Sequence, residues 1–95
     1  MKYACYILYS PLLDKYYIGE TENLEERIRL HNTGFFKNAY TSKVSDWELY
    51  LMISCRDRIQ ARKIEKYIKN MKSRKYIENL KNKPEFLKRL EEKYS

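Results

Sequence analysis

The chain has 95 residues, of which 43% are hydrophobic and 35% charged, with only two glycines and two prolines. This length and composition exclude a disordered tail and leave room for one modest core, so we expect a single domain over residues 1–95. The apolar stretch at residues 3–9 is too short to span a membrane and lacks a signal-peptide cleavage pattern. Cys5 and Cys55 form no metal-binding motif and predict packing residues of a reducing compartment. We therefore expect a cytoplasmic protein without a membrane partner.

The formal net charge of +7 is unevenly distributed along the chain. Residues 56–83 contain eleven Lys or Arg and three Asp or Glu, whereas residues 1–55 contain six and seven. Such a basic segment is typical of a surface that contacts phosphates, and equally of a solvated lysine-rich helix face. The candidates for phosphate contact in this segment are Arg62, Lys66, Lys69, Lys72, Arg74 and Lys75.

The first half of the chain predicts a hairpin, a helix and a third strand. Residues 3–9 are aromatic and branched on both alternating faces, which predicts a strand in the middle of a sheet, and residues 15–19 can pair with it in an antiparallel hairpin. Thr21 or Asn23 caps a predicted helix that ends at residues 32–34. Residues 33–46 have few apolar anchors and predict a surface loop, and residues 47–54 predict the third strand.

The second half predicts three helices. Asp57 caps a helix whose apolar residues fall on one face, Ser73 caps a shorter helix, and Pro84 begins a last helix over about residues 84–94. The apolar stripe of this last helix closes the core of the domain, the interpretation that we favour, or docks a partner. The order β-β-α-β-α-α-α predicts an α+β fold with a small three-stranded antiparallel sheet flanked by helices.

Glu65 is the one carboxylate in the strongly basic predicted helix. Arg62 lies at i−3 and Lys69 at i+4, so the local pattern favours an ordinary Glu–Lys pair worth a few tenths of a kcal/mol. The alternative is that Glu65 holds a divalent ion where a phosphate docks, because Mg²⁺ keeps several waters and needs only one or two carboxylates. The local pattern leaves both interpretations open.

Motifs elsewhere in the chain favour the second interpretation. Residues 4–6 (Ala-Cys-Tyr) and 17–19 (Tyr-Ile-Gly) lie on the two predicted hairpin strands, Arg27 follows eight residues later, His31 one turn further, and Glu65 lies early in the helix after the third strand. In this order the residues resemble the motifs of the GIY-YIG endonuclease superfamily. The resemblance covers residues 3–80 and is to small stand-alone members, and more distantly to the amino-terminal nuclease domain of an excinuclease.

The resemblance implies a metal-dependent endonuclease that hydrolyses phosphodiester bonds in nucleic acid, DNA rather than RNA, in DNA repair or processing. Glu65 would bind Mg²⁺ or Mn²⁺, and Arg27 would hold the phosphate. Tyr6, Tyr17 or His31 would serve as the general base, and a histidine with an unperturbed pKa near 6.5 is chemically the easier one. The alternative is a catalytically inactive nucleic-acid-binding module with the same fold.

Three features depart from the family pattern. The first motif has Ala-Cys in place of Gly-Ile, a change in packing residues that keeps the tyrosine. Glu20 stands where some relatives carry a lysine, so any proton transfer by that lysine is absent. A family asparagine that follows the glutamate has no clean match among the three asparagines of this region, Asn70, Asn79 and Asn82.

Overall fold

The computed structural model describes residues 3–35 and 40–95. The elements are β1 (Tyr3–Ser10), β2 (Lys15–Thr21), α1 (Leu24–Asn32), the 3₁₀ helix η1 (Tyr40–Lys43), β3 (Glu48–Cys55), α2 (Arg58–Met71), α3 (Arg74–Asn82) and α4 (Pro84–Lys93). The predicted α+β order is confirmed. The prediction of a surface loop over residues 33–46 is wrong in part, because η1 lies within it and contains a fully buried threonine; residues 36–39 lie outside the described residues.

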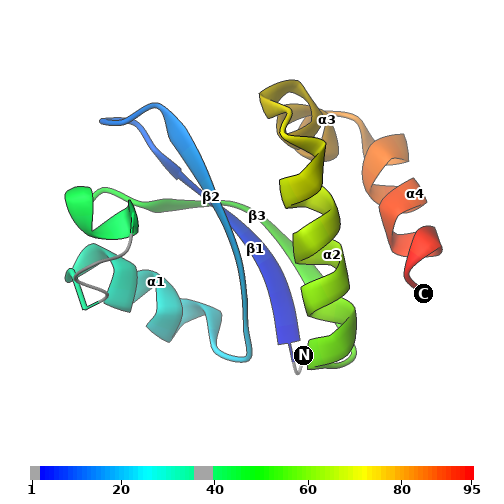
Figure 1. Ribbon diagram of the computed structural model, residues 1–95, viewed down its shortest axis with the longest axis horizontal. Helices are drawn as coiled ribbons and strands as arrows, with labels where there is room; N and C mark the ends of the chain where they lie inside the picture. The colour runs from blue at the N-terminus through cyan, green and yellow to red at the C-terminus, as the bar shows by residue number, and fades with distance from the viewer. Residues whose placement is uncertain (1–2, 36–39) are drawn as a thin grey trace.

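The three strands form one antiparallel sheet in the order β2-β1-β3. β1 is therefore the central strand, as its apolar sequence predicts, and β2 is an edge strand. Figure 1 shows α1 and α2 on either side of β2, so that helices from the two halves of the chain flank this edge. Among the described residues, no helix is long and apolar enough to cross a membrane.

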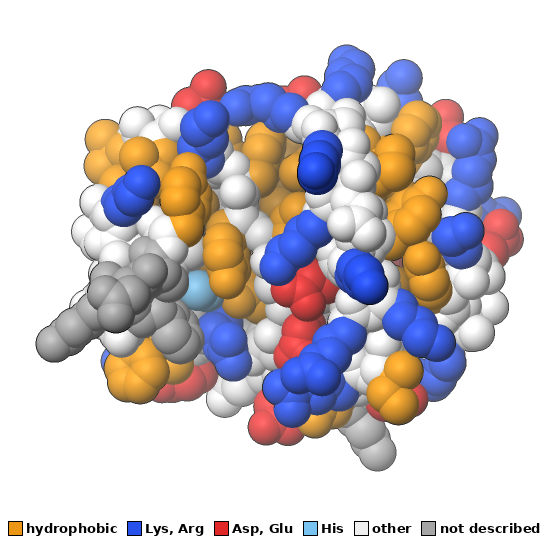
Figure 2. Space-filling model, in the orientation of Figure 1, with side chains coloured by type: hydrophobic (Ala, Val, Ile, Leu, Met, Phe, Trp, Pro, Cys, Tyr) orange, Lys and Arg blue, Asp and Glu red, His pale blue; other side chains and the backbone are white. Residues whose placement is uncertain are grey.

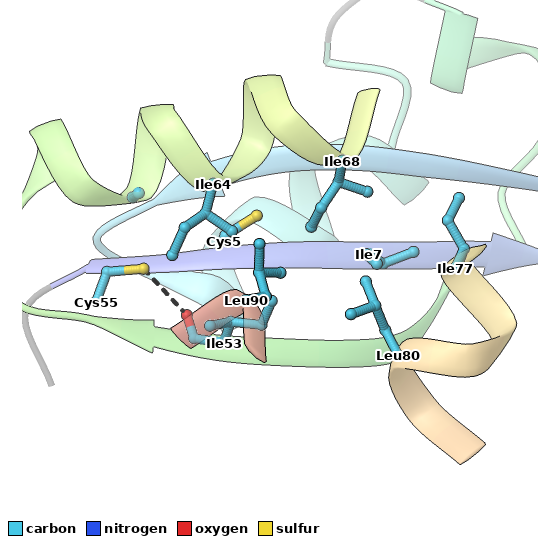
Figure 3. Packing of buried hydrophobic residues seen from close by; sticks show 10 residues of the cluster. Cys5, Ile7, Ile53, Cys55, Ile64, Ile68, Ile77, Leu80 and Leu90 are labelled. Carbon is cyan, nitrogen blue, oxygen red and sulfur yellow. Dashed lines mark hydrogen bonds between the residues drawn. The ribbon is translucent and has the colours of Figure 1, made fainter. Parts of the chain in front are cut away.

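Alternating side chains of β1 divide the core into two clusters. On one face Cys5 and Ile7 pack with Ile64 and Ile68 of α2, and Figure 3 shows side chains of α3 and α4 completing this cluster. Leu90 of α4 is 2% exposed within it, which agrees with the core role expected for the last helix. Each fully buried aliphatic side chain of this kind contributes about 1.5–3 kcal/mol to stability.

On the opposite face of β1, Tyr6 and Leu8 pack with Trp47 and with α1. The side chain of Asn32, at the end of α1, accepts a hydrogen bond from the backbone N–H of Trp47 and donates one to its carbonyl. This pair of bonds fixes the end of α1 against the start of β3. Tyr6 therefore lies in the layer between the sheet and α1.

Local capping signals set where the helices begin. The side chains of Asn23, Asp57 and Ser73 each accept a hydrogen bond from the backbone N–H three residues further on, as the sequence predicts. Lys72 caps the C-terminal end of helix α2, and its backbone is left-handed with φ 48° and ψ 41°. A side chain with a Cβ is strained in this region, where glycine is preferred.

We expect Lys72→Gly to raise the melting temperature by about 4–8 °C, because glycine avoids a cost of about 1 kcal/mol at this backbone conformation. Thermal unfolding followed by circular dichroism measures the change. Lys72→Ala is the matched control, since it removes the same charge but keeps the Cβ. An equal gain from both variants would contradict the role of backbone strain.

Candidate active site

The absence of a side chain at Gly19 shapes the edge of the sheet. Gly19 pairs with Tyr6 across β1 and β2, and a Cβ built on Gly19 would lie 2.5 Å from the hydroxyl oxygen of Tyr6. The glycine thus leaves the space through which the Tyr6 hydroxyl reaches the strand edge. Tyr17, two residues before Gly19, points to the same face of β2.

A polar cleft of about 240 Å³ opens at this edge, between β2, α1 and α2. It brings together four of the five residues that the sequence predicts as catalytic: Tyr6, Tyr17, Arg27 and Glu65. The other lining residues are Gly19, Glu20, Arg58 and Arg62. Figure 2 shows this region as a central pair of acidic patches bordered by Lys and Arg side chains.

His31, the fifth predicted residue, lies behind Tyr6 and not among the residues that line the cleft. It is 2% exposed, with Nε2 3.1 Å from the Tyr6 hydroxyl oxygen and Nδ1 2.6 Å from Oγ1 of Thr41. Burial, together with the charge of Arg27, lowers the pKa of His31 to about 4. The imidazole is therefore neutral near pH 7, and it lacks the advantage as a base that an unperturbed histidine would have.

Tyr6 is a buried, protonated phenol at neutral pH. Its side chain is 1% exposed, and burial, followed by the neighbouring Tyr17, raises its pKa above the usual value, while Arg27 acts in the opposite direction. The ring centroids of Tyr6 and Tyr17 are 6.4 Å apart, and the Tyr17 ring meets the His31 ring edge-on at 5.0 Å. The two tyrosines and the histidine thus form one packed group.

Thr41 is a member of this group that the sequence did not identify. It is fully buried and hydrogen-bonded to His31, and its carbonyl accepts a hydrogen bond from Nε1 of Trp47 at 2.9 Å. It lies in the segment predicted as a surface loop, because a single threonine between polar residues carries no periodic signal. Its role becomes visible only in the folded chain, where η1 contacts α1.

The α2 side of the cleft carries Arg58, Arg62 and Glu65, which are spaced i, i+4 and i+7 and therefore share one helix face. The predicted pair is present, with Nζ of Lys69 2.8 Å from Oε2 of Glu65. The Glu65 side chain is 19% exposed and still lines the cleft. Glu65 is thus both a partner of Lys69 and a carboxylate that a phosphate-bound ion could reach.

Glu20 provides a second carboxylate at the cleft. Its Oε2 lies 3.5 Å from Nε of Arg58 and 3.7 Å from Nε of Arg62, and its side chain is 13% exposed. The sequence pattern shows Glu20 only as the position of a missing lysine, and it does not single out Arg58. The i, i+4, i+7 spacing up to Glu65 would have revealed Arg58, whereas the contact to Glu20 depends on the tertiary fold.

The remaining predicted phosphate-contact residues differ in their surroundings. Lys66, Lys69, Lys72 and Lys75 are exposed. Arg74 instead forms ion pairs with Asp14, in the loop between β1 and β2, and with Glu78 of α3. Its structural role is to fix α3 to the hairpin, and these pairs already occupy the guanidinium that the sequence assigned to phosphate.

The cleft offers donors of the kind that a hard divalent ion prefers. Two carboxylates, Glu20 and Glu65, line it together, and Mg²⁺ or Mn²⁺ takes one or two carboxylates along with waters and phosphate oxygens. Within residues 3–35 and 40–95 there is no cluster of three or more His, Cys, Asp or Glu side chains that could hold a metal. The donor set thus fits a hard ion shared with a phosphate group.

Comparison with protein families supports the resemblance of the motifs. The family model of the GIY-YIG catalytic domain matches residues 2–82. The chain belongs to the GIY-YIG family. No curated protein and no solved structure matches it. Membership points to a nuclease-type function with nucleic acid as the substrate class.

Two departures of this GIY-YIG member from the family pattern can be located in the structure. Ala4 and Cys5, which replace the first two residues of the name-giving motif, are fully buried, so the change alters packing and leaves Tyr6 in place. Of the described residues that line the cleft, none is an asparagine. The family asparagine therefore stays unassigned in this chain.

We expect Gly19→Ala to lower the free energy of unfolding by about 1–3 kcal/mol, because the new methyl group must displace the Tyr6 ring. Urea denaturation measures the loss. Unchanged stability would contradict the close approach of Tyr6 to Gly19.

The lowered pKa of His31 predicts a pH dependence of stability. Below about pH 6.5 the unfolded chain protonates its histidine while the folded chain does not until about pH 4. Stability should therefore fall as the pH drops from 6.5 to 4, by up to about 3 kcal/mol relative to a His31→Gln variant. Urea denaturation of both proteins across this range measures the difference between their free energies of unfolding. The titration of the carboxylates contributes equally to both proteins and cancels in this difference. Parallel pH profiles would contradict a buried neutral His31.

Proposed function

We propose that this chain is a divalent-metal-dependent endonuclease that hydrolyses phosphodiester bonds in DNA, in DNA repair or processing in the cytoplasm. The observation that carries the proposal is the cleft at the edge of β2, where Tyr6, Tyr17, Arg27 and Glu65 line one space. These residues come from elements that are far apart in the sequence. Family membership supports the nuclease class of the reaction.

Arginines would bind the scissile phosphate. Arg27 from α1 and Arg58 and Arg62 from α2 approach the cleft from its two sides. A guanidinium stays charged at any physiological pH and donates two parallel hydrogen bonds to phosphate oxygens. Fixed donors of this kind favour the transition state, in which negative charge accumulates on the phosphoryl oxygens.

Glu65, with Glu20 nearby, would hold the divalent ion. A bound Mg²⁺ or Mn²⁺ would neutralise phosphate charge and lower the pKa of a bound water. The two carboxylates are also paired with Lys69, Arg58 and Arg62, which keeps them fixed in position before substrate binds. The same cations lower the cost of placing two carboxylates in one cleft.

Tyr6 and Tyr17 would face the attacking water, with His31 as a positioning residue. The hydrogen bond between the Tyr6 hydroxyl and Nε2 of His31 fixes the direction of the phenol. Thr41 holds the other ring nitrogen, so the imidazole cannot rotate away. Because the pKa of His31 is lowered, this residue is a weak base. We therefore assign it the role of orienting the Tyr6 hydroxyl and not that of removing the proton from water directly.

We expect Glu65→Gln to reduce the rate of DNA cleavage at least about 100-fold while DNA affinity stays equal or rises, because the variant loses the ion but also one negative charge. The assay uses plasmid, nicked and branched DNA and matched RNA with Mg²⁺ or Mn²⁺. Glu92→Gln on the exposed face of α4 removes the same charge away from the cleft and should cleave normally.

The second candidate is an inactive binding module, which the basic surface of α2 would support equally. It predicts that the wild-type chain binds DNA with strong salt dependence and cuts none of the substrates with either ion. That result would overturn the enzyme proposal. Cleavage that disappears in Glu65→Gln would exclude the binding module.

The positioning role of His31 has its own test. Tyr6→Phe should reduce kcat at least about 100-fold, because it removes the hydroxyl that would face the attacking water. His31→Gln can still hydrogen-bond that hydroxyl and should lose much less activity than His31→Ala, with KM unchanged in both. Equal loss in His31→Gln and Tyr6→Phe would contradict a positioning role for His31, because the glutamine keeps a hydrogen-bond partner for the Tyr6 hydroxyl.

A further inference from the structure

A second cavity lies beside the cleft, along the same seam between β2 and α2. Its volume is about 260 Å³. Tyr16 and Ile18 of β2 and Ile68 of α2 contribute apolar surface, and Lys15, Lys69 and Lys72 contribute cations. Figure 2 shows a hollow with hydrophobic side chains inside it and Lys or Arg side chains around it, next to the central acidic patches. We call this space the basic cavity.

The basic cavity adjoins the cleft, because neighbouring residues of β2 and of α2 line the two spaces. Along β2, Glu20 of the cleft is followed on the same strand face by Ile18 and Tyr16 of the cavity. Along α2, Glu65 of the cleft is ion-paired to Lys69 of the cavity. A strand of nucleic acid whose phosphate lies in the cleft therefore meets the basic cavity next.

We propose that the basic cavity binds an unpaired nucleotide of the substrate strand, a few nucleotides from the phosphate that is cut. This inference rests on the proposed nuclease function and names the form of its substrate. A base that is stacked and paired in a duplex cannot enter a cavity, whereas an unpaired base can leave the stack at little cost. The substrate class is thus DNA with an unpaired or displaced nucleotide near the cleavage site.

The surface of the cavity has the two properties that a nucleotide requires. The ring of Tyr16 and three isoleucines, Ile18, Ile68 and Ile77, offer apolar contact to the flat face of a base. The Tyr16 ring is held in place by Arg74, whose guanidinium carbon is 5.1 Å from the ring centroid, and by the edge-on ring of Tyr50 at 4.9 Å. The platform is therefore rigid before any ligand binds.

Two of the cations around the cavity, Lys15 and Lys72, are available for phosphates. Within the described parts of the chain, no ion pair involves Lys15 or Lys72. Lys72 lies seven residues after Glu65, about 10 Å further along the direction of α2, which corresponds to about three nucleotides of a B-form strand. The left-handed backbone at Lys72 ends α2 and carries this lysine at the edge of the cavity.

The test measures binding without cleavage. The full chain carrying Glu65→Gln is titrated against two DNA duplexes of the same sequence, one fully paired and one with a single extra unpaired nucleotide, by fluorescence anisotropy. We expect the duplex with the unpaired nucleotide to bind about tenfold more tightly, because stacking of one base on the protein increases the affinity by about this factor. 2-Aminopurine at the unpaired position should lose fluorescence on binding. Equal affinities, or an unquenched probe, would overturn the proposal.

Three further substitutions in this background identify the site. Lys72→Gly, which should leave the fold intact or more stable, and Ile18→Phe, which fills the cavity without changing charge, should each abolish most of the tenfold preference. Lys63→Gln is the control, because Lys63 is exposed on α2 and does not line the cavity; it should weaken both duplexes alike and keep the preference. A preference that survives both cavity variants would overturn the assignment.

The outcomes separate this proposal from the nuclease proposal. A preference for the unpaired nucleotide without any cleavage by the wild-type chain would support the cavity and overturn the nuclease. Cleavage by the wild-type chain, together with equal affinities for the two duplexes, would support the nuclease and overturn the cavity. If an acidic peptide with phenylalanine residues displaces the probe at lower concentration than DNA does, the cavity binds a protein segment and the nucleotide proposal is wrong.

Discussion

The close approach of Tyr6 to Gly19 is the constraint on which the candidate site depends. Tyr6 stands in the central strand and is almost fully buried, so its hydroxyl can reach the edge of the sheet only because the facing residue of β2 has no side chain. The same position lets the hydroxyl meet His31 on the inner side and the cleft on the outer side. The tyrosine of the first name-giving motif and the glycine of the second thus depend on each other. Their contact forms when β1 and β2 pair.

Electrostatics explain how the cleft can hold so many charges. Arg27, Arg58 and Arg62 face Glu20 and Glu65 in a small space at the protein edge, and the cations and carboxylates stabilise each other before substrate binds. The side chains of Arg58 and Arg62 are 57% and 63% exposed, which keeps the cost of desolvating these cations low. In the proposed mechanism, a phosphate with its divalent ion would exchange into this arrangement, because it brings both signs of charge. Strong binding of nucleic acid would then depend on the exposed lysines around the cleft, whose contribution falls with salt.

Much of the fold and part of the site follow from local sequence signals. Strand patterns, three capping residues and the i, i+4 spacing of α2 are local, and they predict the elements that the structure contains. The resemblance to the GIY-YIG motifs points to Tyr6, Tyr17, Arg27 and Glu65 as candidates, and the structure brings these four residues to one cleft. Thr41, the pairing of Glu20 with Arg58, and the lowered pKa of His31 could not be predicted in this way, because each arises from residues that are distant in sequence and meet only in the folded chain. The segment that contains Thr41 has no periodicity, so burial there depends on its neighbours.

In the proposed mechanism, a divalent ion in the cleft contacts the phosphate that is cut. Single-turnover cleavage of DNA with sulfur in place of one non-bridging oxygen at the cut phosphate tests this contact directly, because Mg²⁺ binds sulfur poorly and the softer Mn²⁺ binds it better. We expect one of the two sulfur diastereomers to be cut slowly with Mg²⁺ and Mn²⁺ to restore its rate, with no such recovery in Glu65→Gln. Cleavage at equal rates with both ions for both diastereomers would contradict an ion held at the phosphate by Glu65.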